Sequence, residues 1–186
     1  MGAGYVSAYH IRAVQSLEFA TVVGIADLNL KQAGEMAERF GIPNVYSSLA
    51  EMKAANPDVI HILTPPSSHR VLAIEALEMG CHVFVEKPMA ETAADCDAMI
   101  AKAQEKGLAL SVNHSARFDP VILEALDRVR KGECGDVLNV EFIRSSEYAP
   151  YGGGALPPPY RTGGYPFQDL GVHGLYLLEA FLGRLH

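Results

Sequence analysis

Short apolar runs and helix-periodic segments alternate along the first part of the chain. Strands are predicted at residues 19–26, 45–46, 58–64, 81–85 and 108–112. The longer runs are rich in β-branched residues, which is typical of strands covered on both faces. Between them, apolar residues recur at helical spacing and predict helices at residues 5–16, 28–40, 49–55, 71–79 and 92–103. Strands that alternate with helices indicate an α/β fold with a doubly wound parallel sheet and right-handed crossovers.

The pattern changes in the last third of the chain. Asp119 and Pro120 predict the cap and first turn of a helix. Residues 137–143 alternate polar and apolar side chains, which favours a half-exposed strand of an antiparallel sheet. Residues 145–165 contain clustered glycines and prolines and predict a long loop, and a final helix is expected at 171–182. We therefore expect two domains, residues 1–116 and residues 117–186, the second of α+β type.

Charge and composition narrow the class of protein. Lysine and arginine number 15 and aspartate and glutamate 22, so the formal net charge of the 186 residues is −7. This balance argues against a nucleic-acid or anionic-membrane partner. The apolar runs are far shorter than the roughly 20 residues that span a bilayer, and no signal peptide is visible. Three widely spaced cysteines without a CxxC pair favour a reduced, cytoplasmic protein.

A glycine turn opens the chain and predicts an anion-binding helix start. Gly2-Ala3-Gly4-Tyr5-Val6-Ser7 reads GxGxxS, one residue short of the GxGxxG fingerprint. Gly2 permits a tight turn and Gly4 permits close approach to a pyrophosphate, while the backbone of Tyr5 and Val6 would add N–H groups at the helix start. Glycines at such a place are also common in simple turns. The motif alone is therefore weak.

Asp27 strengthens the case for a dinucleotide. It ends the next predicted strand, 23 residues after Gly4, close to the spacing of about 20 expected for a ribose-binding carboxylate. A carboxylate there would repel a 2′-phosphate, and neither Leu28 nor Asn29 is an arginine that could bind one. NAD is therefore favoured over NADP. Asp27 could equally cap the following helix, and the two roles can coexist.

Two further groups of polar residues are candidates for catalysis. Glu86-Lys87-Pro88 follows a predicted strand at the sheet edge where ligands lie, and a lysine there can stabilise a developing alkoxide. Asp169 and His173 lie four residues apart and share one helix face. Histidine, with an unperturbed pKa of about 6.5, suits removal of an alcohol proton. The alternatives are a loop charge for Lys87 and a helix cap beside a solvated histidine for the pair. The remaining histidines have no metal-ligand spacing, so no metal site is expected.

The order of these motifs resembles one family. GxGxxS, Asp27, Thr64-Pro65-Pro66-x-x-His69, Glu86-Lys87-Pro88, Arg117-Phe118-x-Pro120 and Asp169-x-x-x-His173 together resemble the Gfo/Idh/MocA oxidoreductases over essentially the whole chain. The resemblance implies a Rossmann-type domain followed by a domain with a large open antiparallel sheet. It implies that Lys87 contacts substrate and nicotinamide, with Asp169 and His173 in the catalytic set. The implied cofactor-lining positions are Gly2, Gly4, Tyr5, Val6, Asp27, Thr64, Pro65, His69, Glu86, Lys87 and Asn113. Arg117, Tyr148 and Arg161 are the implied substrate contacts.

The sequence departs from the family pattern in four places. No strand precedes the glycine turn, and only one strand of the second domain's sheet is present, so we expect an internal piece of a longer protein. Two strands would then have unpaired buried backbone groups, each costing roughly 1–3 kcal/mol. Ser7 replaces the third glycine. Tyr176 stands at a position that is often acidic in relatives, which affects the expected substrate class.

The activity expected by resemblance is NAD-dependent oxidation of a secondary hydroxyl of a sugar, inositol or related polyol. An NAD-dependent hydrolase or lyase of the same family is an alternative, as is a non-catalytic nucleotide-binding fragment. The parent protein is expected to form homo-oligomers, because relatives commonly pair through the missing sheet.

Overall fold

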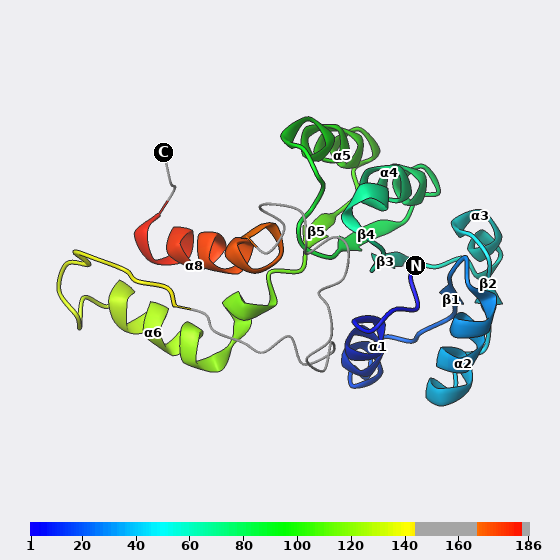
Figure 1. Cartoon of the computed structure of the whole chain (residues 1–186), viewed down its shortest axis with the longest axis horizontal. Coiled ribbons are helices and arrows are strands. Elements are labelled where there is room, and N and C mark those ends of the chain that lie inside the picture. Colours follow the sequence, from blue (N-terminus) through cyan, green and yellow to red (C-terminus); the bar gives the residue numbers. More distant parts are fainter. Residues whose placement is uncertain (144–166, 184–186) are drawn as a thin grey trace, which may run out of the picture. The chain divides into compact units, whose positions relative to one another are not determined.

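The computed structural model describes residues 1–143 and 167–183, in two compact units that divide after Asn113. The division falls three residues before the boundary expected from the sequence. The first unit contains two sheets, and the strands within each sheet are parallel (Figure 1). One contains β1 (Ile25–Ala26) and β2 (Val45–Tyr46), and the other contains β3 (Val59–Ile62), β4 (His82–Val85) and β5 (Leu110–Val112) in that order.

Helices connect these strands as the sequence predicts. They are α1 (Ser7–Gln15), α2 (Leu30–Phe40), α3 (Leu49–Met52) with the 3-10 turn η1 (Lys53–Ala55), η2 (Pro66–Ser68), α4 (His69–Glu78) and α5 (Ala93–Lys106). Their ends follow local sequence signals. Thr92 caps α5 by accepting the Asp95 N–H, and Gly41 ends α2 in the left-handed conformation, with φ of 65°.

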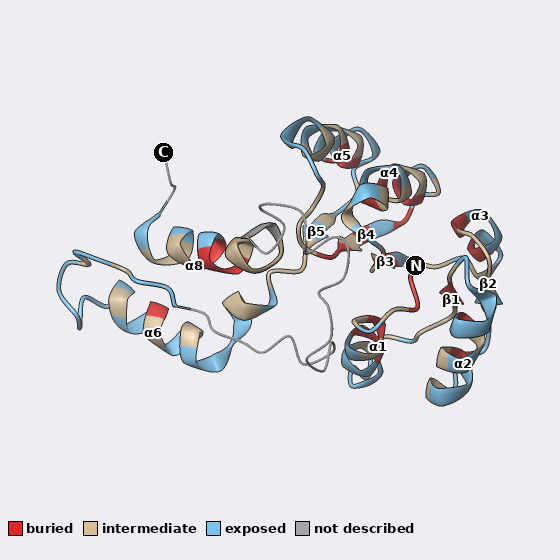
Figure 2. Ribbon diagram, viewed as in Figure 1, coloured by how far each residue is buried: buried red, intermediate tan, exposed pale blue. Residues whose placement is uncertain are grey.

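Two hydrophobic clusters lie on opposite sides of β1. Ile25 and Ala26 are neighbours on β1 and therefore point to opposite faces. Ala26 packs in a cluster with residues of α3, α4, α5, β3 and β4, whereas Ile25 packs with residues of α1 and α2. Buried residues accordingly line the inner sides of these helices (Figure 2). The arrangement is a doubly wound α/β fold, as the sequence predicts.

Met1 and Gly2 join the two sheets. The Met1 amino group donates to the His61 carbonyl at 2.7 Å, and the Leu63 N–H donates to the Met1 carbonyl at 2.8 Å. On the other side, the Gly2 N–H donates to the Ala26 carbonyl at 2.8 Å. The two residues thus take the place of a strand end between β1 and β3. Beside them lies a cavity of about 980 Å³, lined largely by apolar residues of segments 10–25 and 56–63.

The predicted strand at 19–26 is mostly wrong. Only Ile25 and Ala26 form a strand, and residues 19–24 border the cavity without regular structure. Phe19 is 87% exposed. The physical reason is that an extended segment becomes a strand only when a neighbour pairs with its backbone, and β2 offers this segment only two residues.

The second unit is helical in the part that the structure describes. It contains η3 (Ser115–Phe118), α6 (Pro120–Arg130), the π-helical turn η5 (Phe167–Gly171) and α8 (Val172–Leu182). The side chain of Asp119 caps α6 by accepting the Val121 N–H at 2.9 Å, as predicted. Residues 137–143 form no strand, and Leu138 is 94% exposed. That prediction is wrong because alternation creates a strand only where a partner strand is in place. The predicted loop at 145–165 lies entirely outside the described residues.

No helix within 1–143 or 167–183 is long and apolar enough to cross a membrane. No group of three or more histidine, cysteine or acidic side chains there could hold a metal ion. Cys81, Cys96 and Cys134 are all free thiols.

Candidate functional site

The glycine turn places backbone, rather than side chains, at the start of α1. Gly2 has a φ of +100°, and a Cβ at this position would lie 2.9 Å from the backbone carbon and oxygen of Leu63. A Cβ on Gly4 would meet no atom within 4 Å. Gly2 is therefore required by the fold itself. Gly4, in contrast, leaves open space beside the first N–H groups of the helix.

Ser7 explains how the turn forms without its third glycine. The Ser7 hydroxyl donates to the Gly4 carbonyl at 2.5 Å, and the residue is 1% exposed. A serine is small enough to fit this buried position, and its hydroxyl satisfies a carbonyl of the turn. The replacement therefore preserves the turn.

Asp27 binds the glycine turn directly. Its Oδ2 accepts the Ala3 N–H at 2.7 Å and its Oδ1 accepts the Asn29 N–H at 2.8 Å. The alternative role, capping the next helix, belongs instead to Asn29, whose side chain accepts the Gln32 N–H. Each carboxylate oxygen of Asp27 keeps a second lone pair that can accept a hydrogen bond from a ribose hydroxyl. The turn and the carboxylate together fit the pyrophosphate and ribose of a dinucleotide.

Thr64, Pro65 and His69 lie where β3 leads into α4. His69 is fully buried, with Nε2 2.7 Å from the Thr64 carbonyl oxygen and Nδ1 3.0 Å from the Pro88 carbonyl oxygen. The Thr64 and Ser68 hydroxyls lie 2.7 Å apart. His69 therefore ties the segment after β3 to the segment after β4, and it shapes this sheet edge from inside.

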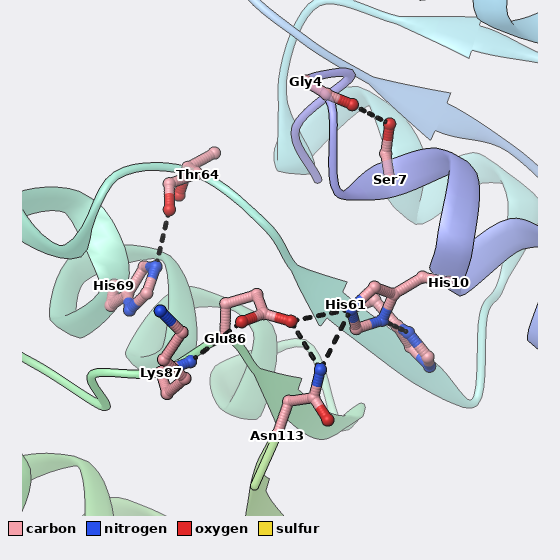
Figure 3. Close-up of polar contacts among 9 residues, drawn as sticks. All are labelled: Gly4, Ser7, His10, His61, Thr64, His69, Glu86, Lys87 and Asn113. Carbon is pink, nitrogen blue, oxygen red and sulfur yellow. Dashed lines mark hydrogen bonds and ion pairs between the residues drawn. The ribbon is translucent and has the colours of Figure 1, made fainter. Parts of the chain in front are cut away.

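Glu86 and Lys87 follow β4 at the same edge. The Glu86 side chain is nearly buried and points toward α1 and the end of β5 rather than into solvent (Figure 3). Its Oε1 lies 2.8 Å from His10 Nε2 and accepts the Asn113 side-chain N–H at 2.5 Å, and its Oε2 accepts the Lys87 N–H at 3.2 Å. The Lys87–Pro88 peptide bond is cis. Asn113, a predicted cofactor-lining residue, thus binds Glu86.

Electrostatics keep this network ordered. Burial raises the pKa of Glu86, but hydrogen bonds from His10 and Asn113 outweigh burial and hold that pKa below its usual value. Burial, together with the nearby His10 and the Met1 ammonium, lowers the pKa of His61 to about 4. Glu86 is therefore ionised and His61 neutral at pH 7.

His10 was not predicted as a functional residue. From the sequence, His10 was one of the histidines without metal-ligand spacing. The sequence does contain a signal, because Ser7, His10 and Ile11 share one face of the predicted helix with i, i+3 and i+4 spacing. The structure shows that this face is buried. Two polar residues on the buried face of a helix require buried partners.

The second unit contains the other catalytic candidates. Asp169 lies in η5 and is half-buried, and His173 lies in the first turn of α8 and is buried. His173 Nδ1 lies 2.5 Å from the Tyr176 hydroxyl, which also accepts the Ala116 N–H at 3.2 Å. Tyr176 therefore orients the His173 ring. The His114 ring stacks on the Tyr176 ring, with centroids 4.4 Å apart.

The predicted substrate contacts are only partly described. Arg117 lies in η3 and is half-buried. Tyr148 and Arg161 fall outside the described residues. Lys87 belongs to the first unit, and Asp169, His173 and Arg117 belong to the second.

Comparison with known proteins identifies the class. Residues 1–114, more than half of the chain, match the Gfo/Idh/MocA family, described as an oxidoreductase family with an NAD-binding Rossmann fold. The chain belongs to this family. The resemblance in the motifs and the predicted Rossmann-type fold are thereby confirmed, as is the NAD-binding class of the first unit.

Several curated dehydrogenases are similar to the chain in sequence. D-apiose dehydrogenase from Paraburkholderia graminis is 28% identical over 98% of this chain and 48% of its own length. Trans-1,2-dihydrobenzene-1,2-diol dehydrogenase from Mus musculus is 33% identical over 87% of this chain and 48% of its own length. The chain thus spans about half the length of these relatives. A 1-carboxy-3-chloro-3,4-dihydroxycyclohexa-1,5-diene dehydrogenase from Comamonas testosteroni is 44% identical over 54% of this chain and 25% of its own length.

Solved structures agree with the fold. An oxidoreductase from Agrobacterium radiobacter in complex with NAD+, L-tartaric acid and magnesium has a TM-score of 0.85 and 24% identity, over 98% of this chain and 53% of that one. A putative myo-inositol dehydrogenase from Sinorhizobium meliloti has a TM-score of 0.80 and 25% identity, over 99% of this chain and 54% of that one.

Proposed function

We propose that the chain is the cofactor-binding part of a dehydrogenase that uses NAD in preference to NADP. The observation that carries this proposal is the Asp27 carboxylate held against the glycine turn, beside the open backbone at Gly4. A fixed negative charge at the ribose position disfavours a 2′-phosphate. The family described as NAD-binding supports the same cofactor class.

The proposed substrate is a secondary hydroxyl of a sugar, an inositol or a related polyol. The support is that three relatives are named as dehydrogenases of D-apiose, of a D-glucoside and of myo-inositol. Two relatives, including the one at 44% identity, are named for diols on an unsaturated six-membered carbon ring. A vicinal diol on a ring is therefore the second candidate substrate. Association of the whole protein into homo-oligomers belongs to the same proposal.

The proposed roles follow from the chemistry of each side chain. Bound NAD supplies the hydride acceptor. His173 removes the hydroxyl proton, and Tyr176 orients its ring through Nδ1. Lys87 holds the substrate oxygen as negative charge develops there, and Asp169 positions His173 or the substrate. Arg117, Tyr148 and Arg161 are the proposed contacts to the rest of the substrate.

Titration with NADH and NADPH tests the cofactor proposal. The purified 186-residue chain is mixed with each, and nicotinamide fluorescence and thermal shift are followed. Tighter binding of NADH is expected. Equal or tighter binding of NADPH would contradict the preference, and no binding of either would contradict the cofactor role.

A polyol screen then tests the reaction. Steady formation of NADH with inositols, sugars or cyclic diols is expected, and Lys87→Ala should abolish it, whereas the exposed Lys53→Ala should not. Turnover without net NADH would favour the hydrolase or lyase alternative. Turnover that survives Lys87→Ala would exclude the proposed role of this lysine.

A further inference from the structure

A buried polar network surrounds Glu86. His10 and Glu86 are 8% and 9% exposed, and His10 Nε2 lies 2.8 Å from Glu86 Oε1. Because an ionised carboxylate only accepts hydrogen bonds, His10 Nε2 carries a hydrogen and donates it. The same carboxylate accepts N–H groups of Asn113 and Lys87. Three donors from three parts of the chain therefore fix one carboxylate.

The other side of the His10 ring is also held. Its Nδ1 lies 3.0 Å from the Nδ1 of His61 on β3, so one ring donates to the other. The Phe84 ring packs against both imidazoles, with centroids 5.8 Å from His10 and 5.0 Å from His61. Glu86 and His61 thus hold the two edges of the His10 ring (Figure 3), and Phe84 packs against it.

His10 connects two parts of the proposed site. It lies on α1, the helix that begins at the glycine turn, whereas Glu86 directly precedes Lys87 at the end of β4. We propose that His10 is a positioning residue, which fixes the Glu86 carboxylate and through it the Lys87 backbone against α1, so that the glycine turn and Lys87 keep one spacing for a bound dinucleotide. This inference rests on the proposed function.

The charges around the carboxylate give the inference a pH signature. Glu86 faces His10 from α1, Asn113 after β5 and the Lys87 amide. His61 on β3 faces His10 and is near the Met1 amino group, whose pKa is lowered by burial to about 5. Removing the His10 donor takes away one of the hydrogen bonds that lower the pKa of Glu86, while Asn113 and the Lys87 amide still lower it and burial raises it. The carboxylate then takes up a proton at higher pH than in the wild type, and its hydrogen bond with the Lys87 amide weakens.

Two amide substitutions separate the contacts of His10. In His10→Gln the side-chain amide takes the place of the imidazole Nε2 and can still donate to Glu86. In His10→Asn the shorter amide reaches only the place of Nδ1 and cannot donate to Glu86. The dissociation constant of NADH is measured by fluorescence at pH 6, 7 and 8, with His82→Gln as a control at an exposed histidine outside the network. We expect His10→Gln to bind within about threefold of wild type and His10→Asn to bind about tenfold more weakly, with a larger loss at pH 6 than at pH 8.

The other outcomes overturn the inference. Unchanged binding by His10→Asn, or equal and pH-independent losses in both variants, would show that the contact to Glu86 does not position the site. If His10→Asn does not fold by circular dichroism, Glu86→Gln takes its place, and unchanged NADH binding by that variant is the contradicting result. If the wild-type protein binds no NADH, the proposed function is contradicted. The His10 variants test only the positioning role, because their binding is compared with that of the wild type.

Discussion

Asp27 shows how one side chain can serve both the fold and the cofactor. Its two oxygens hold the backbone N–H groups of Ala3 and Asn29, so its negative charge is fixed at the proposed ribose position. We expect Asp27→Ser to relieve repulsion of a 2′-phosphate and to lower the ratio of NADPH to NADH dissociation constants by about tenfold or more. Fluorescence titration measures the ratio. An unchanged ratio would mean that Asp27 acts only on the turn.

His61 should make the folded chain less stable in acid than at neutral pH. Its pKa is about 4 in the folded chain, against 6.5 for an ordinary histidine. Between these values the unfolded chain binds a proton that the folded chain does not, so the contribution is complete above pH 6.5 and is lost as the pH falls to about 4. The expected loss is up to about 3 kcal/mol.

Urea melts of wild type and His61→Phe between pH 4 and 7 measure this contribution. Burial, followed by the charge of Arg117, also lowers the pKa of His114, so the difference between the two proteins, rather than the wild-type curve, isolates His61. Parallel curves would contradict the assignment. Glu86, whose pKa is held low, acts in a lower window and loses its contribution only as the carboxylate protonates.

At the scale of elements, the two glycines of the turn have different roles: Gly2 is needed for folding and Gly4 for the proposed cofactor binding. An alanine at position 2 would have to adopt a φ of +100°, and its Cβ would collide with the backbone of Leu63. We therefore expect Gly2→Ala to destabilise the first unit by about 1–3 kcal/mol. A Cβ at Gly4 meets open space, so Gly4→Ala should leave stability within about 0.5 kcal/mol of wild type but weaken NADH binding. Thermal melts and NADH titrations of both variants test this contrast. Loss of stability in Gly4→Ala would contradict it.

The sequence predicts those elements whose signals are local. The cap at Thr92, the stop at Gly41 and the first turn at Pro120 each act within a few residues, and the helices that they bound are confirmed. Strands depend on partners elsewhere in the chain, and this is why the predictions for 19–26 and 137–143 are largely or wholly wrong. A run of β-branched residues indicates a segment that favours an extended, buried conformation. It forms a strand only where a neighbouring strand provides backbone hydrogen bonds.

The candidate site follows the same rule. Asp27 and Glu86-Lys87-Pro88 could be placed at the sheet edge from spacing along the chain, because parallel strands end at one edge. The link between His10 and Glu86 joins residues 76 positions apart, and no periodicity indicates it. Similarly, the sequence marks Tyr176 as a departure from relatives, but its hydroxyl contacts with His173 and Ala116 are visible only in the folded chain.

At the scale of the whole molecule, the candidate cofactor-binding residues and most of the candidate catalytic residues lie in different units. The first contains both hydrophobic clusters, the glycine turn, Asp27 and Lys87. The second contains Asp169, His173 and Arg117. Dinucleotide binding and proton removal are therefore assigned to different units in the proposed function, and the NADH titration and the polyol screen report on them separately.

The position of Met1 and Gly2 between the two sheets has a consequence for the order of folding. Ile25 pairs with Val45, Val59 with His82 and Val83 with Leu110, so the strand pairs within each sheet close loops of 20 to 27 residues. The contacts of Met1 with β3 span about 60 residues, which makes their closure slower. The two sheets should therefore form first and join last, and they should separate first when the native chain opens. Hydrogen exchange measures this directly, and we expect the Leu63 amide, bonded to Met1, to exchange faster than the Glu86 amide, bonded to Ile62.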